Sequence, residues 1–254
     1  MKRKAALFII LFAVFVSLTY KAYATPVSVP PVPKVNLSID GAQSPKEYVD
    51  SIKLLIVITV LALVPSILVL MTSFTRIIVV LSFVRNALST QQTPPNQVLI
   101  GLALFLTFFI MRPVYNQVNT QAIQPYLNEK ITQEEAIEIG SKPIKQFMLK
   151  QTYQKDLALF VKASKTGEIQ TPEDTPFSVL IPAFVISELK TAFEMGFLIY
   201  IPFIVIDMVV ASILMSMGMF MLPPVVISLP FKLLLFVMVD GWHLLVKSLI
   251  ESFV

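Results

Sequence analysis

The sequence predicts an all-α, polytopic membrane protein made of kinked helices and helical hairpins, with a small helical extracytoplasmic domain. Two observations support this fold class. Hydrophobic residues make up 56% of the 254 residues and charged residues only 14%, whereas soluble domains are closer to half apolar and a quarter charged. In addition, several apolar stretches approach or exceed the length of about 20 residues that a membrane-spanning helix needs.

The first 24 residues are predicted to be a secretory signal peptide. Three basic residues at positions 2–4 precede an apolar run from Ala5 to Leu18, and Ala22-Tyr23-Ala24 fits a small-residue cleavage site. An uncleaved anchor helix is the alternative, because the apolar run is only modestly shorter than a span. Cleavage would remove four positive charges and bring the formal charge of +4 to zero. The basic isoelectric point is therefore no evidence for nucleic-acid binding.

Residues 25–51 are expected to form a proline-rich extracytoplasmic linker, because five prolines occur there without any hydrophobic periodicity. Residues 52–115 are expected to form an N-terminal transmembrane helical hairpin. Its first apolar stretch, Lys53–Val84, is longer than one straight span, so we expect a bend near Thr72–Arg76. Its second, Val98–Met111, is short and is expected to end at Arg112-Pro113, sheltered by protein rather than lipid.

Residues 116–181 are expected to form the extracytoplasmic helical domain. Thr132 and Glu135 have the spacing of a capping box, which predicts a short helix ending before Gly140. A second, longer helix is expected to start near Pro143 and to present one mostly apolar face. The charged residues of this domain are expected to be a solvated surface.

Residues 182–254 are expected to form C-terminal transmembrane helices joined by a methionine-rich loop. Four of the eleven methionines lie between Met215 and Met221. Gly218 and the Pro223-Pro224 pair predict a non-helical turn here, between two apolar arms. Methionine is unbranched and polarizable, so a ring of such side chains would make a deformable seal. The alternative is that these methionines are ordinary membrane-buried apolar residues.

The apolar C-terminal region carries isolated charges. Lys190 and Glu194 have the i, i+4 spacing of a pair within one helix. Four other charges, Glu188, Asp207, Lys232 and Asp240, have no such local partner. Charges at membrane depth are costly and usually face a bundle interior or a water-filled cavity. These four residues are therefore expected to pair between helices or between subunits; the alternative is that some of them lie at the membrane interface.

The composition gives no support for an enzyme. The chain has one histidine and no cysteine, which excludes the usual zinc sites and any disulfide. The sequence contains no G-x-S-x-G, Walker A or G-x-G-x-x-G motif. We therefore expect no catalytic residues, no cofactor and no metal.

Three stretches resemble one family: MGMFMLPPVVISLPFKLLLFVMVDGW at 217–242, LMTSFTRIIVVLSFVRNALSTQQTPPNQVLIGLALFLTFFIMRPV at 70–114, and PAFVISELKTAFEMGFLIYIPFIVIDMVVASILMSMGM at 182–219. They are similar, in order and spacing, to the FliP/SctR family, the P component of type III export gates. In the commoner version of the family, three methionines follow one another in the loop. This chain has Phe220 in the middle, so the seal would be bulkier and stiffer.

The resemblance implies a pore-forming subunit that conducts unfolded flagellar proteins and is sealed by Met219, Phe220 and Met221. It implies a homo-oligomer of about five copies, with FliQ-like and FliR-like subunits, FlhA-like and FlhB-like export proteins, and location in the bacterial cell membrane at the flagellar basal body. It also favours inter-subunit pairing, in which Glu188 or Asp207 meets Lys232 across a subunit boundary.

Two other functions stay open at this stage. The first is the homologous core subunit of a virulence injectisome, although Leu222-Pro223-Pro224 and Ser228-Leu229-Pro230 look more flagellar. The second is an unrelated ion-coupled transporter that uses Asp207 as a proton site.

Overall fold

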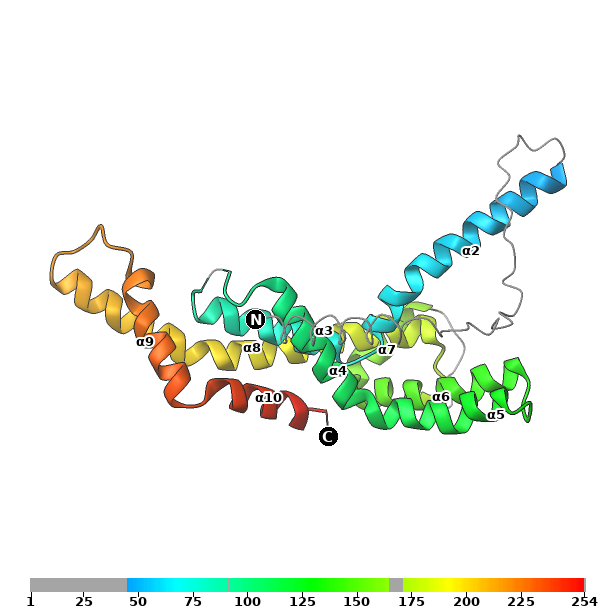
Figure 1. Cartoon of the computed structure of the whole chain (residues 1–254). Helices are drawn as coiled ribbons and strands as arrows, with labels where there is room; N and C mark the ends of the chain where they lie inside the picture. The colour runs from blue at the N-terminus through cyan, green and yellow to red at the C-terminus, as the bar shows by residue number, and fades with distance from the viewer. Residues whose placement is uncertain (1–44, 91, 165–170, 254) are drawn as a thin grey trace, which may run out of the picture. The chain divides into compact units, whose positions relative to one another are not determined.

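The computed structural model describes residues 45–90, 92–164 and 171–253. Every regular element in these ranges is helical, which confirms the predicted all-α fold class (Figure 1). The predicted signal peptide, residues 1–24, and residues 25–44 of the predicted linker lie outside the described residues. The principal helices are α2 (Pro45–Leu70), α3 (Phe74–Ala87), α4 (Asn96–Val118), α6 (Gln133–Gln151), α7 (Gln154–Ser164), α8 (Phe177–Ser216), α9 (Pro224–Met238) and α10 (Gly241–Glu251).

Contacts divide the chain into two compact units, residues 1–54 and 55–254. The described part of the first unit is the beginning of α2, so residues 45–51, which the sequence assigned to the linker, are helical. The second unit contains the other helices and all the side chains discussed below. The predicted domain boundaries at 115/116 and 181/182 fall inside α4 and α8.

The first apolar stretch is broken where the sequence predicts a bend. Helix α2 ends at Leu70 and α3 begins at Phe74. The Thr72 hydroxyl donates to the carbonyl of Val69 at 2.8 Å and accepts from the backbone N–H of Phe74 at 3.3 Å. One side chain thus satisfies a carbonyl at the end of α2 and a free amide at the start of α3.

The second apolar stretch continues further than predicted. We expected it to end at Arg112-Pro113, but α4 runs through Pro113 to Val118. A π-helical segment, η1 (Asn119–Ile123), and a short helix, α5 (Gln124–Leu127), follow without a break. A proline inside a helix removes one backbone hydrogen bond, and its ring crowds the carbonyl of the residue four positions earlier. A helix can tolerate this with a kink when neighbouring elements hold both of its halves. The run from Asn96 to Leu127 therefore has 32 residues.

The capping box at Thr132 is confirmed, but the predicted helix end before Gly140 is wrong. Thr132 accepts from the backbone N–H of Glu135, and the Glu135 carboxylate accepts from the backbone N–H of Thr132 at 2.8 Å. Helix α6 then continues through Gly140 and Pro143 to Gln151. A Cβ placed on Gly140 would lie 3.1 Å from the Cβ of Ala122 in η1. Gly140 thus allows two helices to approach closely and is no stop signal here.

The main core forms around α3. Helix α3 buries Ile77, Val80, Leu81 and Val84, and the cluster that contains them also includes residues of α4, α8, α9 and α10. A second cluster, centred on Met148, Leu180 and Phe184, joins α6 to the first part of α8. Helix α3 is therefore the element around which the C-terminal helices are assembled.

Two helical runs, Asn96–Leu127 and Phe177–Ser216, are long and apolar enough to cross a membrane. Helices α9 and α10 meet at a 63° bend and would make a third span if counted together. A Cβ placed on Gly241 would lie 2.3 Å from the Phe236 ring, so a larger residue would not fit at this bend. Many large apolar side chains of α4, α8 and α9 are exposed, including Phe105, Leu198 and Val237. Such surfaces are typical of lipid or subunit contacts.

Candidate functional site

The predicted turn between two apolar arms is present. Helix α8 ends at Ser216 and α9 begins at Pro224, and we call the connecting residues, Met217–Pro223, the methionine turn (Figure 1). Gly218 has a φ of 76°, which glycine adopts without steric cost. The backbone N–H of Met219 donates to the carbonyl of Leu214, and that of Gly218 donates to the carbonyl of Met215, both at 3.0 Å. This pair of bonds is a Schellman motif, which ends the helix and fixes the start of the turn.

The methionine turn presents its apolar side chains outward from this chain. Met221 is 99% exposed, Phe220 77% and Met219 40%. On the far side, Pro224 occupies the first position of α9, where proline has no amide to lose and its φ already suits a helix. The turn is therefore held at both ends by backbone chemistry, while its apolar tip has few contacts within the chain.

The two arms are joined below the turn by an ion pair. Lys232 in α9 donates from Nζ to Oδ2 of Asp207 in α8 at 2.6 Å. The lysine side chain is 1% exposed and the aspartate side chain 27%. An ammonium group buried this deeply needs an anionic partner, because desolvation of an unpaired charge is very costly.

Two hydroxyl groups complete this pair. The Ser228 hydroxyl donates to Oδ1 of Asp207 at 2.5 Å, and Lys232 Nζ also donates to the hydroxyl of Ser89 at 2.8 Å. Ser89 follows α3 and has a φ of 57°, which is uncommon for a residue other than glycine. The pair therefore connects both arms to the segment between α3 and α4.

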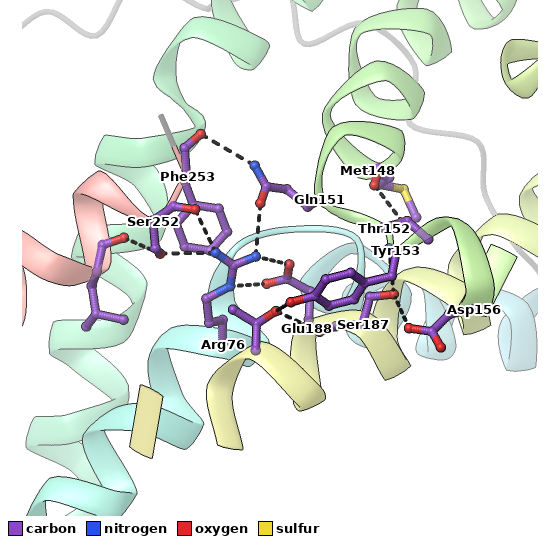
Figure 2. A network of polar contacts seen from close by, with 12 residues as sticks. Arg76, Met148, Gln151, Thr152, Tyr153, Asp156, Ser187, Glu188, Ser252 and Phe253 are labelled. Atoms are coloured by element: carbon purple, nitrogen blue, oxygen red, sulfur yellow. Dashed lines mark hydrogen bonds and ion pairs between the residues drawn. The ribbon is translucent and has the colours of Figure 1, made fainter. Parts of the chain in front are cut away.

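A second buried ion pair lies nearer the start of α8. Arg76 in α3 donates from Nε to Oε2 of Glu188 at 2.9 Å and from Nη2 to Oε1 of the same carboxylate. Both side chains are almost completely buried. Figure 2 shows the guanidinium lying against the carboxylate in this two-bond arrangement. Arginine forms such bidentate contacts because its donors are fixed in one plane.

The same guanidinium also holds the end of the described chain. Arg76 Nη1 donates to the carbonyl of Ser252 at 2.9 Å and to its hydroxyl at 3.0 Å, and Nη2 donates to Oε1 of Gln151 at 3.0 Å. The ring of Phe253 lies 3.8 Å from the guanidinium carbon, a cation–π contact. Figure 2 shows these groups converging on Arg76 from separate parts of the chain.

A hydroxyl network next to Glu188 attaches the insert to α8. The Ser187 hydroxyl accepts from the backbone N–H of Tyr153 at 3.1 Å and donates to Oδ2 of Asp156 at 2.8 Å (Figure 2). The Tyr153 hydroxyl lies 3.2 Å from that of Thr191. The connection between α6 and α7 is therefore bound to the same turn of α8 that carries Glu188.

Glu188, Asp207 and Lys232 each pair with a residue of another helix, whereas Asp240, the N-cap residue of α10, is exposed. Asp207 binds Lys232, which is one of the two pairings that we predicted, but the two residues belong to the same chain. Glu188 does not meet Lys232 in this chain; it binds Arg76. Contact of these charges with a neighbouring subunit stays a prediction, as does the sealing role of Met219, Phe220 and Met221. Lys190 and Glu194 form the predicted i, i+4 pair at 3.5 Å.

Sequence reasoning missed the roles of Arg76, Ser89 and Gln151. Arg76 lies within the predicted bend at Thr72–Arg76, and no partner is predicted for it from the sequence. The run that follows it, Ile77–Leu81, is entirely apolar, a signal that could have suggested a buried partner. Among the described residues, no group of three or more His, Cys, Asp or Glu side chains is arranged to hold a metal.

Known proteins are similar to this chain over most of its length. The family described as the FliP family matches residues 57–249. The flagellar biosynthetic protein FliP of Bacillus subtilis is 58% identical over 85% of this chain and 98% of its own length. The proteins of the same name from Pectobacterium carotovorum and Aquifex aeolicus are 56% and 51% identical, over 82% and 92% of their own lengths and 84% and 87% of this chain. With these similarities covering the core, the methionine turn and both buried ion pairs, the chain belongs to the FliP family.

Proposed function

We propose that this protein is a pore-forming subunit of the flagellar type III protein export gate. The gate would conduct unfolded flagellar proteins across the bacterial cell membrane at the flagellar basal body. Membership of the FliP family and relatives named flagellar biosynthetic proteins support the flagellar role. The observation that carries the pore role is the methionine turn, which exposes three large apolar side chains between two long apolar helices.

The seal depends on symmetry. In a closed ring of identical subunits, the same turn of every copy is brought to the axis. Met219, Phe220 and Met221 of all copies would then form an apolar constriction, which excludes water and blocks ions. Because methionine side chains repack easily, the constriction would open around a passing unfolded chain. We propose a ring of about five copies, with FliQ-like and FliR-like subunits and with FlhA-like and FlhB-like proteins nearby.

The alternatives are less well supported. The named relatives with 50% identity or more are flagellar, which favours a flagellar gate over a virulence injectisome. For an ion-coupled transporter, Asp207 would have to take up and release a proton. Its two oxygens are instead bound by Lys232 and Ser228 of the neighbouring arm, contacts that support a structural role in joining the two arms.

Replacement of all three turn residues tests the seal. The variant Met219→Ala, Phe220→Ala and Met221→Ala should assemble, because these side chains contribute little to the core of the chain. Its constriction should be wider, so cells that make it should leak ions or a small impermeant dye, while export persists at least in part. Charged replacements at the same positions should leak as well.

A matched control distinguishes the effect of substitutions in the methionine turn from that of substitutions in helix α8. Met208 and Met215 lie in α8 and are 67% and 58% exposed. Met208→Ala combined with Met215→Ala removes exposed methionines of the same arm and should not cause a leak. Equal permeability of the triple variant and the wild type, at equal amounts of assembled gate, would show that the turn is not a seal.

A further inference from the structure

We propose that Arg76 is a positioning residue for the gate, which fixes the base of the two arms that carry the methionine turn. This inference rests on the proposed function, because it assigns a task to Arg76 only if the turn is the seal. We call the contacts of Arg76 with Glu188, Ser252 and Phe253 the Arg76 clamp.

The clamp closes the whole C-terminal region into a loop. Arg76 binds Glu188 in α8 and Ser252 after α10. Between these two residues the chain continues along α8, through the methionine turn, and back along α9 and α10. Phe220 lies midway in the sequence between Glu188 and Ser252. The two arms of the turn therefore begin and end on one guanidinium.

Arg76 suits this task through its geometry. Its Nε, Nη1 and Nη2 groups offer five N–H donors, and five hydrogen bonds are present, to Glu188, Ser252 and Gln151. The bonds to Glu188 hold α8, and those to Ser252 hold the residues after α10. The bonds to Glu188 use Nε and Nη2, and those to Ser252 use Nη1. One side chain therefore holds both ends of the loop at the same time. Lysine, with one nitrogen, cannot reproduce this fork.

Burial makes the loss of any partner of Arg76 costly. Arg76 is 2% exposed and Glu188 0%. If the C-terminal residues withdraw, Nη1 loses the carbonyl and hydroxyl of Ser252 and the ring of Phe253 withdraws with them. A buried guanidinium that loses partners is strongly destabilised. The clamp therefore resists sliding of α10 against α3 and α8, and motion at the turn is confined to the arms above it.

The consequence for the gate is a defined resting position of the seal. With both ends fixed, the turns of all subunits return to the same radius after a substrate has passed. When one end is released, the arms can shift along each other and the apolar side chains no longer meet in register. Loss of the clamp should thus raise ion permeability although the methionine turn itself is intact.

The experiment uses the full-length chain in assembled gates in cells. Two variants open the clamp in different ways: Arg76→Lys retains the positive charge and loses the fork, and a chain ending at Glu251 releases only the C-terminal end. The control is Lys247→Ala, which removes an exposed i, i+4 pair with Glu251 in the same helix. Leak of a small impermeant dye is measured per assembled gate, beside the triple alanine variant of the turn.

We expect both clamp variants to leak severalfold more than the wild type per assembled gate, and Lys247→Ala to match the wild type. A purely structural Arg76 would lower the amount of assembled gate without changing the leak of each gate. If the triple alanine variant leaks and both assembled clamp variants do not, the clamp inference fails and the seal stands. If none leaks, the seal itself fails. If Arg76→Lys does not assemble, the truncated chain decides, and failure of both to assemble would assign Arg76 to folding and overturn the gate role.

Discussion

The ion pair between Asp207 and Lys232 should respond unequally to removal of its two members. Asp207→Ala would leave an ammonium group that is 1% exposed, with the Ser89 hydroxyl as its remaining hydrogen-bond partner among the described residues. Lys232→Met would leave a carboxylate that is 27% exposed and still accepts from Ser228. Methionine retains most of the apolar stem of the lysine, so this variant changes the charge more than the packing.

The burial of each remaining charge sets the size of the effect. Breaking a buried pair by removing one partner costs about 3–5 kcal/mol, and Asp207→Ala should fall in this range. Lys232→Met should cost less, about 1–3 kcal/mol, because water can reach the remaining carboxylate and one hydrogen bond persists. The double variant removes both charges, so it should be more stable than Asp207→Ala alone, although it carries one more substitution.

Thermal unfolding of the detergent-solubilised full-length protein, followed by circular dichroism, measures these differences. For a chain of this size, 1 kcal/mol corresponds to about 2–4 °C in Tm, so Asp207→Ala should lower Tm by roughly 6–20 °C. Equal losses for the two single variants would contradict the burial argument. A double variant whose loss equals the sum of the two would show that the charges do not interact.

Two further predictions concern helix ends. Gly218→Ala should destabilise the protein by about 1–2 kcal/mol, because its φ of 76° is strained for alanine; Gly101→Ala, in the middle of α4 with open space at its Cβ, should be neutral or slightly stabilising in the same unfolding assay. At α6, the backbone N–H and hydroxyl of Thr132 hold the pKa of Glu135 below its usual 4.5. The capping box therefore stabilises the helix above that pH and weakens as the pH falls through the lowered pKa, so amide exchange in the first turn of α6 should accelerate in acid, whereas Glu135→Gln should show no such pH dependence.

The features that could be predicted from the sequence depend on neighbouring residues. The bend at Thr72, the capping box at Thr132 and the methionine turn are each set by residues within a few positions of one another, and all three are confirmed. Phe220 and Met221 are exposed in this turn, which lies between the Schellman motif at the end of α8 and the prolines at the start of α9.

The errors arose where tertiary packing overrides a local signal. Pro113 and Gly140 were interpreted as the ends of helices and Pro143 as the start of a new one, but all three lie inside helices. Gly140 lies close to Ala122 in a different helix, so that a Cβ at this position would be 3.1 Å from the Cβ of Ala122, and this contact has no trace in the residues next to Gly140. Proline inside a helix is tolerated where neighbouring elements hold both halves in place, which a single sequence does not reveal.

The pairing of the charges could be predicted only in part, and sequence separation explains which part. Asp207 and Lys232 are 25 positions apart and lie in adjacent arms of one hairpin, so their pairing follows from the turn between them. Arg76 and Glu188 are 112 positions apart, and their contact depends on how α3 packs against α8. The cost of an isolated charge in apolar sequence indicates that a partner exists, but only the fold identifies that partner.

Two sets of contacts join the arms of the methionine turn at different distances from it. Asp207 and Lys232 lie at almost equal distances in sequence from Phe220, as do Glu188 and Ser252 further out. The inner pair joins the arms directly, and the outer one joins them through Arg76. A hairpin fixed only near its tip could rotate as a unit, and one fixed only at its base could splay at its tip. Because both positions are fixed by buried charges, the hairpin is restrained against rotation and splaying, and bending of the arms between the pairs is the motion that remains.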